Sequence, residues 1–298
     1  APPSYYRELD PDEFPIRPTF NNPGTGKPEL QMIAASEKGT TPEEDLRNYY
    51  RIYYGCNRFV DSEIGRVLDA VPENTIVVYT ADHGTCSADY ALWSKAHWMY
   101  DLTTNIPLIM AGPGVATGVS HSIVSHVDIL PTLLRACGIS ALNPLFEQNR
   151  VVLGESEGSI RDRHTWIDRM HGVDLAPVLR DPSARVRDLA YISYLRFGNM
   201  PKSGSSGNFY PVRCAVGDRY KLVLNMLESD EFYDLQEDPW ELENRIHSPA
   251  IVGARDRMHD AILDFMDEIT DPLRSYLWGA RPWRTVRRKT FRGDSRLP

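Results

Sequence analysis

The sequence predicts an α/β layer fold followed by a smaller antiparallel α+β unit. In the first part of the chain a long amphipathic helix, short apolar strands and a further helix alternate, as they do in layered α/β domains. After about residue 183, strand-like segments follow one another closely and end in a single helix. That arrangement is typical of a separate antiparallel unit.

The composition is that of a globular protein with one large domain or two unequal ones. The chain has 298 residues, of which 42% are apolar and 25% charged, and its net charge is −8. An acidic chain is a poor partner for nucleic acid or for an anionic membrane surface. No apolar run has the length of a membrane span. We therefore expect neither nucleic acid nor a membrane as a partner.

The first elements are an irregular stretch and a long helix. Residues 1–40 are rich in proline and have little periodicity, so we expect an extended arm or loop. A helix is predicted from Thr41 as N-cap, with Pro42 at the first helical position and Glu44 completing a capping box, to the residue before Pro72. Apolar side chains recur along it every three or four residues, which predicts one buried face. They are Leu46, Tyr50, Tyr53, Cys56, Val60, Ile64, Val67, Leu68 and Val71.

Two unbroken apolar runs come next. Residues 75–80 and 106–110 show no polar alternation, which predicts strands buried on both faces in a parallel sheet. A helix is expected over 127–137, with Asp128 near its start and Gly138 at its end. We assign residues 41–182 to one α/β core on this basis.

The last part of the chain, residues 183–298, is predicted as the antiparallel unit. A flexible loop is expected over 202–207 (KSGSSG) from its composition. The predicted strands are 190–195, 212–216, 220–225 and 231–235, and a helix is expected over 250–269.

Candidate chemistry lies where the first apolar run ends, at Asp82 and His83 before Gly84. In open α/β sheets, ligands bind at the carboxyl ends of strands, and carboxylate and imidazole groups are metal ligands. Lys95 follows and could hold an anionic oxygen through a charge-assisted hydrogen bond. On spacing alone, a capped turn with a surface histidine and an ordinary lysine explains these residues equally simply. For His97, a place in the site and a packing role are equally open.

Seven short motifs keep a fixed order between residues 41 and 245. They are Val60-Asp61 with Ile64-Gly65-Arg66-Val67-Leu68; Ile76-Val77-Val78-Tyr79-Thr80-Ala81-Asp82-His83-Gly84; Leu92-Trp93-Ser94-Lys95; Ile106-Pro107-Leu108-Ile109; Val127-Asp128-Ile129-Leu130-Pro131-Thr132-Leu133; Arg213 with Tyr220-Lys221-Leu222-Val223; and Phe232-Tyr233-Asp234-Leu235 with Asp238-Pro239, Glu241 and Asn244. Together they resemble the carboxy-terminal half of the sulfatase family, which belongs to the alkaline phosphatase superfamily. The resemblance implies part of an alkaline-phosphatase-like sheet flanked by helices.

The resemblance also implies a metal-dependent enzyme that hydrolyses sulfate esters. It assigns Asp82 and His83 as ligands of a divalent cation, calcium first, with magnesium, manganese or zinc as alternatives. It assigns Lys95 as the residue that contacts the sulfate group. We count Lys95 and His97 as the candidate catalytic residues and expect a sulfated small molecule or carbohydrate as substrate.

The family's nucleophile is absent from this sequence. In the family it is a formylglycine made from Cys or Ser in a C/S-x-P/A-x-R motif, and none of Cys56, Cys86, Cys137 and Cys214 stands in such a motif. We therefore expect the formylglycine in a missing amino-terminal part and expect this chain alone to be inactive. That missing half would be a companion chain, because the two apolar runs would otherwise be exposed.

Several expectations stay open at this point. The spacing between Lys95 and Pro107 is also similar to that of phosphonate monoester hydrolases, so a phosphonate monoester or phosphodiester hydrolase of the same superfamily is one alternative. A non-catalytic subunit or binding module is another, because the nucleophile is missing. A homo-oligomer is possible. The few, widely spaced cysteines favour a soluble protein of the cytoplasm over a periplasmic or secreted one.

Overall fold

The computed structural model describes residues 1–95, 97–138, 170–197 and 209–284. The chain forms two compact units. Residues 1–113, 194–212 and 227–245 make up the first, and residues 114–193, 213–226 and 246–298 make up the second. The predicted loop 202–207 lies outside the described residues. The domain boundaries expected near residues 40 and 182 remain a prediction.

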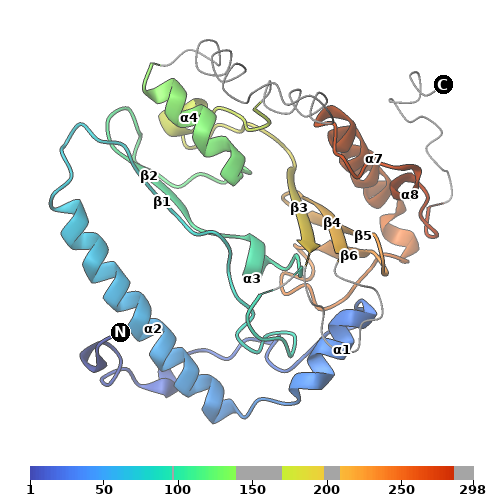
Figure 1. Ribbon diagram of the computed structural model, residues 1–298, viewed down its shortest axis with the longest axis horizontal. Coiled ribbons are helices and arrows are strands. Elements are labelled where there is room, and N and C mark those ends of the chain that lie inside the picture. Colours follow the sequence, from blue (N-terminus) through green and yellow to red (C-terminus); the bar gives the residue numbers. More distant parts are fainter. Residues whose placement is uncertain (96, 139–169, 198–208, 285–298) are drawn as a thin grey trace, which may run out of the picture. The chain divides into compact units, whose positions relative to one another are not determined.

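The order of helices and strands follows the predicted change from alternation to clustered strands (Figure 1). The α-helices are α1 (Glu29–Lys38), α2 (Glu43–Leu68), α3 (Asp101–Thr104), α4 (Ile129–Ala136), α6 (Ala176–Arg180), α7 (Val252–Glu268) and α8 (Tyr276–Gly279). The strands are β1 (Val77–Thr80), β2 (Leu108–Ala111), β3 (Ala190–Phe197), β4 (Phe209–Val216), β5 (Tyr220–Asn225) and β6 (Glu231–Asp234). Short 3-10 helices lie at Pro3–Tyr5, Pro11–Glu13, His126–Asp128 and Pro249–Ile251.

The strands form two sheets in the described part of the chain. β1 pairs with β2 in antiparallel register, with Val77 opposite Ala111 and Thr80 opposite Leu108. The predicted parallel pairing of these two runs is therefore wrong. The predicted burial on both faces is also wrong within this chain, because no residue of β1 or β2 is buried and Ile109 is 59% exposed. Apolar continuity reports a strand that can be covered on both faces and carries no information on strand direction or on which segments cover it. The second sheet has the order β3-β4-β5-β6, so each strand lies beside the next one in the sequence.

The first forty residues are more regular than predicted. α1 occupies Glu29–Lys38, and 3-10 turns lie at Pro3–Tyr5 and Pro11–Glu13, so the prediction of an extended arm is wrong for these segments. α1 follows Pro28 without a side-chain cap, and only Gln31 and Ala35 are buried along it. One buried pair at a spacing of one turn is too short a pattern to indicate a helix in the sequence.

α2 departs from its prediction at both ends. Its N-cap is Pro42, which has no side chain that can cap a helix, and the helix ends at Leu68 instead of at the residue before Pro72. The Thr41 hydroxyl accepts a hydrogen bond from Trp93 Nε1 at 3.1 Å. Leu46 is fully buried, whereas Val67 is 64% exposed. The predicted buried face therefore exists only in the amino-terminal part of the helix within the described structure.

The loop of residues 86–94 is held in a strained conformation by the amino-terminal segment. Four of its non-glycine residues have positive φ angles between 55° and 65°: Ala88, Tyr90, Ala91 and Ser94. Asp89 is buried, pairs with Arg17 at 2.7 Å and accepts a hydrogen bond from the Thr19 hydroxyl. Tyr90 N donates to Thr19 O at 2.7 Å. Each left-handed residue costs about 1 kcal/mol or more, so these contacts offset a real strain.

In the second unit, Asp128 ties the start of α4 to a later segment. The carboxylate is fully buried and accepts from Ser125 N at 2.7 Å and from Val173 N at 2.8 Å. It also forms an ion pair with Arg187, whose side chain is 14% exposed. A buried carboxylate is tolerated when all of its acceptor positions are satisfied in this way.

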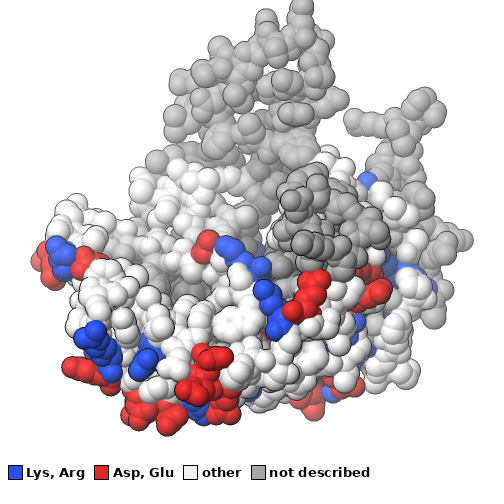
Figure 2. All heavy atoms as spheres, turned by 60° about the horizontal axis from the view of Figure 1, so that its bottom comes forward, with Lys and Arg blue, Asp and Glu red and all other residues white. Residues whose placement is uncertain are grey.

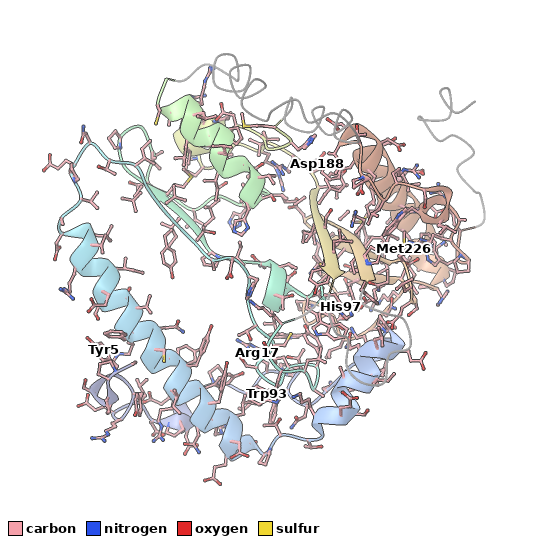
Figure 3. The ribbon with its side chains drawn as sticks, in the orientation of Figure 1. Tyr5, Arg17, Trp93, His97, Asp188 and Met226 are labelled. Carbon is pink, nitrogen blue, oxygen red and sulfur yellow. The ribbon has the colours of Figure 1, made fainter. Side chains whose placement is uncertain are left out.

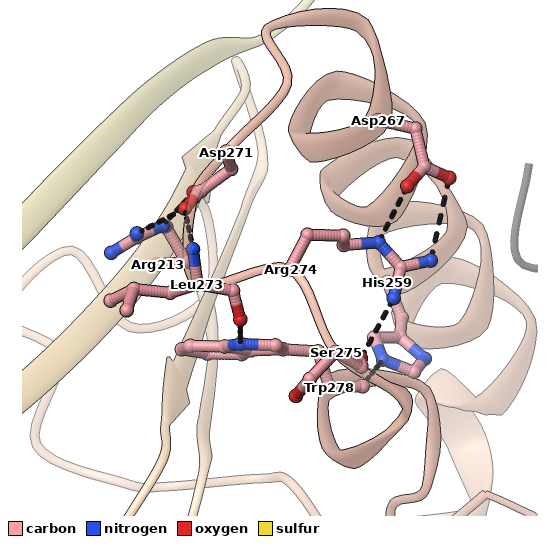
Figure 4. Close-up of polar contacts among 8 residues, drawn as sticks. All are labelled: Arg213, His259, Asp267, Asp271, Leu273, Arg274, Ser275 and Trp278. Atoms are coloured by element: carbon pink, nitrogen blue, oxygen red, sulfur yellow. Dashed lines mark hydrogen bonds and ion pairs between the residues drawn. The ribbon is translucent and has the colours of Figure 1, made fainter. Parts of the chain in front are cut away.

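The segment after α7 folds back onto that helix (Figure 4). Arg213 donates to both carboxylate oxygens of Asp271, at 2.6 and 2.9 Å, and both side chains are buried. His259 Nε2 lies 2.7 Å from the carbonyl of the fully buried Trp278, and Arg284 lies 2.6 Å from His259 Nδ1. Nε2 therefore carries the hydrogen and Nδ1 accepts, which is the neutral form of the imidazole.

Charges on the surface are mixed. On the face drawn in Figure 2, Lys and Arg side chains stand beside Asp and Glu side chains instead of gathering into a patch of one sign. Among the described residues, no helix combines the length and apolar character needed to cross a bilayer.

The Asp128 contacts give the first prediction. Replacing Asp128 by Ala leaves the Arg187 guanidinium buried without its carboxylate, so we expect a loss of about 3–5 kcal/mol in the free energy of unfolding. Asp181→Ala is the control, because its carboxylate is exposed and accepts from Ser183 at the surface, and we expect little change in the free energy of unfolding. Urea titration of both variants measures the difference, and equal losses would contradict the assigned role.

The second prediction concerns pH. Burial lowers the pKa of His259 from 6.5 to about 4. The unfolded chain therefore binds a proton that the folded chain does not between these values, and stability falls as pH drops through this window. We expect His259 to contribute about 3 kcal/mol of this loss. His259→Gln should flatten the pH dependence of the free energy of unfolding in urea between pH 7 and 4.5. The control is His247→Gln at an exposed histidine, which should leave the pH dependence of the unsubstituted protein unchanged.

Candidate metal and anion site

The candidate site begins one residue after β1 ends at Thr80. Asp82 is the more exposed of its two metal-type side chains, at 82%, and His83 is 36% exposed. The backbone N–H of His83 donates to Asp82 Oδ1 at 2.9 Å. This hydrogen bond, with smaller contributions from the nearby His83 and Lys95 side chains, lowers the pKa of the Asp82 carboxyl. The group is therefore held as a carboxylate, which is the form that binds a cation.

The ring of His83 is oriented by its own backbone turn. Nδ1 lies 2.8 Å from the carbonyl oxygen of Gly84. A carbonyl can only accept, so Nδ1 carries the hydrogen and Nε2 keeps a lone pair. Nε2 lies 3.2 Å from Asp82 Oδ2. A carboxylate oxygen and an imidazole lone pair are thus brought together, and a backbone contact of this kind is how proteins orient metal-binding histidines.

Lys95 completes the cluster. Its ammonium group donates to the lone pair of His83 Nε2. A positive group therefore lies against the two donors, which is where their electrostatic field favours a cation. The predicted residues Asp82, His83 and Lys95 are brought together by the structure.

The donor chemistry fits a divalent cation, but only as part of a coordination sphere. Asp82 and His83 offer one oxygen-type and one nitrogen-type ligand. No group of three or more His, Cys, Asp or Glu side chains with metal-binding geometry occurs among the residues that the structure describes. Calcium takes six to eight ligands and zinc about four, so further ligands are required for either ion.

The turn that carries Asp82 and His83 is fixed by close contact with α3. Gly84 N donates to Thr103 O at 3.0 Å. A Cβ atom at Gly84 would lie 1.9 Å from Leu102 O, so only glycine fits. The sequence did not indicate this support, because the segment that forms α3 holds no recognisable motif for metal or anion binding.

Lys95 directly follows the strained loop of residues 86–94. Ser94, with φ 64°, immediately precedes it. The Ser94 carbonyl accepts from Cys86 N at 2.7 Å and from Thr85 Oγ1 at 3.3 Å. Backbone strain that surrounding contacts maintain is frequent at functional sites, and here it sets the direction in which Lys95 leaves the loop.

His97 lies in an aromatic environment away from this cluster of contacts. It is 5% exposed, and its ring centroid lies 3.9 Å from that of Trp98 and 4.1 Å from that of Tyr210 (Figure 3). These are the surroundings that the packing interpretation predicts. A catalytic role for His97 stays a prediction.

Comparison with known proteins agrees with the motifs. A family model described as Sulfatase matches residues 11–139. The "Uncharacterized sulfatase YidJ" of Escherichia coli (strain K12) is 35% identical over 274 residues, which is 91% of this chain. The chain belongs to the sulfatase family. The family match contains Asp82, His83 and Lys95.

This sulfatase chain spans about half the length of the curated relatives it matches. It covers 48% of YidJ and 52% of the "Delta 4,5-hexuronate-2-O-sulfatase" of Bacteroides thetaiotaomicron, to which it is 27% identical over 288 residues. Among solved structures, the phosphonate monoester hydrolase of Agrobacterium radiobacter aligns with 89% of this chain and 53% of its own. The TM-score is 0.66 at 21% sequence identity. The predicted alkaline-phosphatase-like fold is confirmed.

Gly84 gives the third prediction. Gly84→Ala drives a methyl group into Leu102 O, so the turn and α3 must separate, and we expect a loss of about 1–3 kcal/mol in the free energy of unfolding. Gly65→Ala is the control, because no atom lies within 4 Å of an added Cβ there and alanine favours the helix, so stability should rise by up to about 1 kcal/mol. Urea titration of both variants measures the free energy of unfolding. An unchanged value for Gly84→Ala would contradict the close approach of residue 84 to Leu102 O.

Proposed function

We propose that this chain is part of a metal-dependent sulfatase that hydrolyses a sulfate ester. The observation that carries the proposal is the convergence of the Asp82 carboxylate, the His83 lone pair and the Lys95 ammonium at the end of β1. Membership of the sulfatase family supports the reaction type. The substrate we propose is a sulfated small molecule or a sulfated carbohydrate. The name of one relative, a hexuronate sulfatase, is consistent with a carbohydrate.

Asp82 and His83 would hold the divalent cation, with calcium proposed first. A cation bound there supplies Lewis-acid stabilisation to an anionic oxygen of the sulfate group. The His83 N–H keeps Asp82 ionised, and the Gly84 carbonyl keeps Nε2 of His83 available as a ligand. A cation bound by His83 Nε2 would take the place that the Lys95 ammonium has at that atom.

Lys95 would act on the transferring group. Its ammonium stands beside the two donors, so a sulfate held there accepts a charge-assisted hydrogen bond from it. Because such a bond strengthens as negative charge builds on the sulfate oxygens, Lys95 stabilises the transition state more than the bound ester.

The nucleophile and the remaining metal ligands are proposed to come from a part of the protein outside these residues. A formylglycine is the proposed nucleophile because the resemblance to the family implies one, and it would come from elsewhere because the four cysteines all lie outside a C/S-x-P/A-x-R motif. That part would also cover apolar surface, since Val67 is 64% and Ile109 is 59% exposed.

A phosphonate monoester hydrolase activity is the second candidate. The spacing of Lys95 and Pro107 favours it, and the likeness to the Agrobacterium radiobacter enzyme is one of fold. Comparing kcat/KM of the complete natural protein for an aryl sulfate and an aryl phosphonate monoester separates the two activities. A preference for the phosphonate would replace the sulfatase proposal.

The fourth prediction tests Lys95 and the cation together. In the complete natural protein, Lys95→Ala should lower kcat for an aryl sulfate about 10²- to 10³-fold, because one donor to the developing charge is removed. Chelation should abolish turnover, and added calcium should restore it. Lys38→Ala is the matched control: this lysine is exposed at the end of α1, so its replacement should leave kcat unchanged. Full activity of either the Lys95 variant or the chelated enzyme rules the mechanism out.

A further inference from the structure

The last of the seven motifs, from Phe232 to Asn244, contributes no residue to the cluster around His83. It contains Glu241, whose side chain is completely buried and whose φ angle is 50°. A buried carboxylate on a left-handed residue is costly twice, in desolvation and in backbone strain. Contacts of the Glu241 carboxylate must therefore compensate the desolvation and the backbone strain.

Glu241 binds the first residue of α3. Its Oε2 accepts a hydrogen bond from Asp101 N at 2.7 Å. A carboxylate at the first turn of a helix satisfies a backbone N–H that has no partner within the helix. The position of α3 is therefore tied to the side chain of Glu241.

Glu241 is itself held by the buried lysine Lys27. The Lys27 ammonium donates to the Glu241 carbonyl and to Tyr233 Oη, the latter at 2.8 Å. Its Nζ lies 4.4 Å from the centre of the Tyr233 ring and 4.7 Å from that of Tyr100. Cation–π contacts and hydrogen bonds thus compensate the buried ammonium and fix the turn that carries Glu241.

From α3 the contacts continue to the candidate site. Thr103 O accepts from Gly84 N at 3.0 Å, and Gly84 O accepts from His83 Nδ1 at 2.8 Å. The chain of contacts thus runs from Glu241 through the backbone of α3 to the imidazole. A displacement of α3 would alter the direction of the His83 lone pair.

We propose that Glu241 is a positioning residue that holds the Asp82–His83 turn in its cation-binding geometry through α3. The part that concerns the cation rests on the proposed function, whereas the part that concerns the turn does not. Glu241 touches neither cation nor substrate in this proposal. It acts through the Asp101 N–H and the Thr103 carbonyl.

The fifth prediction uses three variants of the complete natural protein. Glu241→Ala removes the acceptor for Asp101 N–H, and we expect the dissociation constant for calcium, measured by titration calorimetry, to rise about 10- to 100-fold. Glu241→Gln keeps an amide oxygen at the same place and should restore most of the affinity. Glu237→Gln is the control: it alters an exposed carboxylate in the same segment of the chain, and calcium affinity should remain unchanged.

Amide hydrogen exchange over residues 82–85 is the second measurement, and it does not depend on a cation. Loss of the Glu241 contact should speed exchange of this turn at least about tenfold in Glu241→Ala, with little change in the two Gln variants. Unchanged exchange and unchanged calcium affinity in Glu241→Ala would overturn the proposal. If exchange responds but the parent protein binds no calcium and hydrolyses no sulfate ester, the positioning role stands and the proposed function fails.

Discussion

The hydrogen bond from Gly84 to Thr103 is the contact on which the candidate site depends. It brings the backbone after β1 so close to α3 that a side chain at residue 84 is sterically excluded. With that approach in place, the Gly84 carbonyl faces the imidazole of His83 and selects its tautomer. The chemistry of the side chains is thus decided by backbone geometry, because the same His on a freely solvated turn would exchange between tautomers.

The sequence predicted most of the elements and the central residues of the site. The strand over 75–80 and the helix over 127–137 could be predicted because apolar periodicity is a local property. Asp82, His83 and Lys95 were singled out through the order of the motifs and the resemblance it carries, since their spacing alone left an ordinary turn equally possible. What escaped prediction depends on distant contacts. Strand direction in β1 and β2, the helix α1, and the exposed half of α2 are decided by which segments meet in space.

The polar groups with the largest structural effect were also the hardest to foresee. Arg17 and Asp89 lie far apart in the sequence and look like ordinary surface charges until the fold pairs them. Glu241 belongs to a motif that was recognised, yet its contact with Asp101 N could not be read from spacing. Composition describes which charges exist, whereas burial decides which of them become structural.

The contact between Lys27 and Tyr233 joins residues 206 positions apart in the chain. During synthesis the Asp82 turn leaves the ribosome long before residues 233–241 have been made. Contacts of such sequence separation form late and slowly, because a long loop must close first. The contact between Glu241 and Asp101 N can therefore form only after residue 241 has been made, and a chain cut short before that residue lacks it.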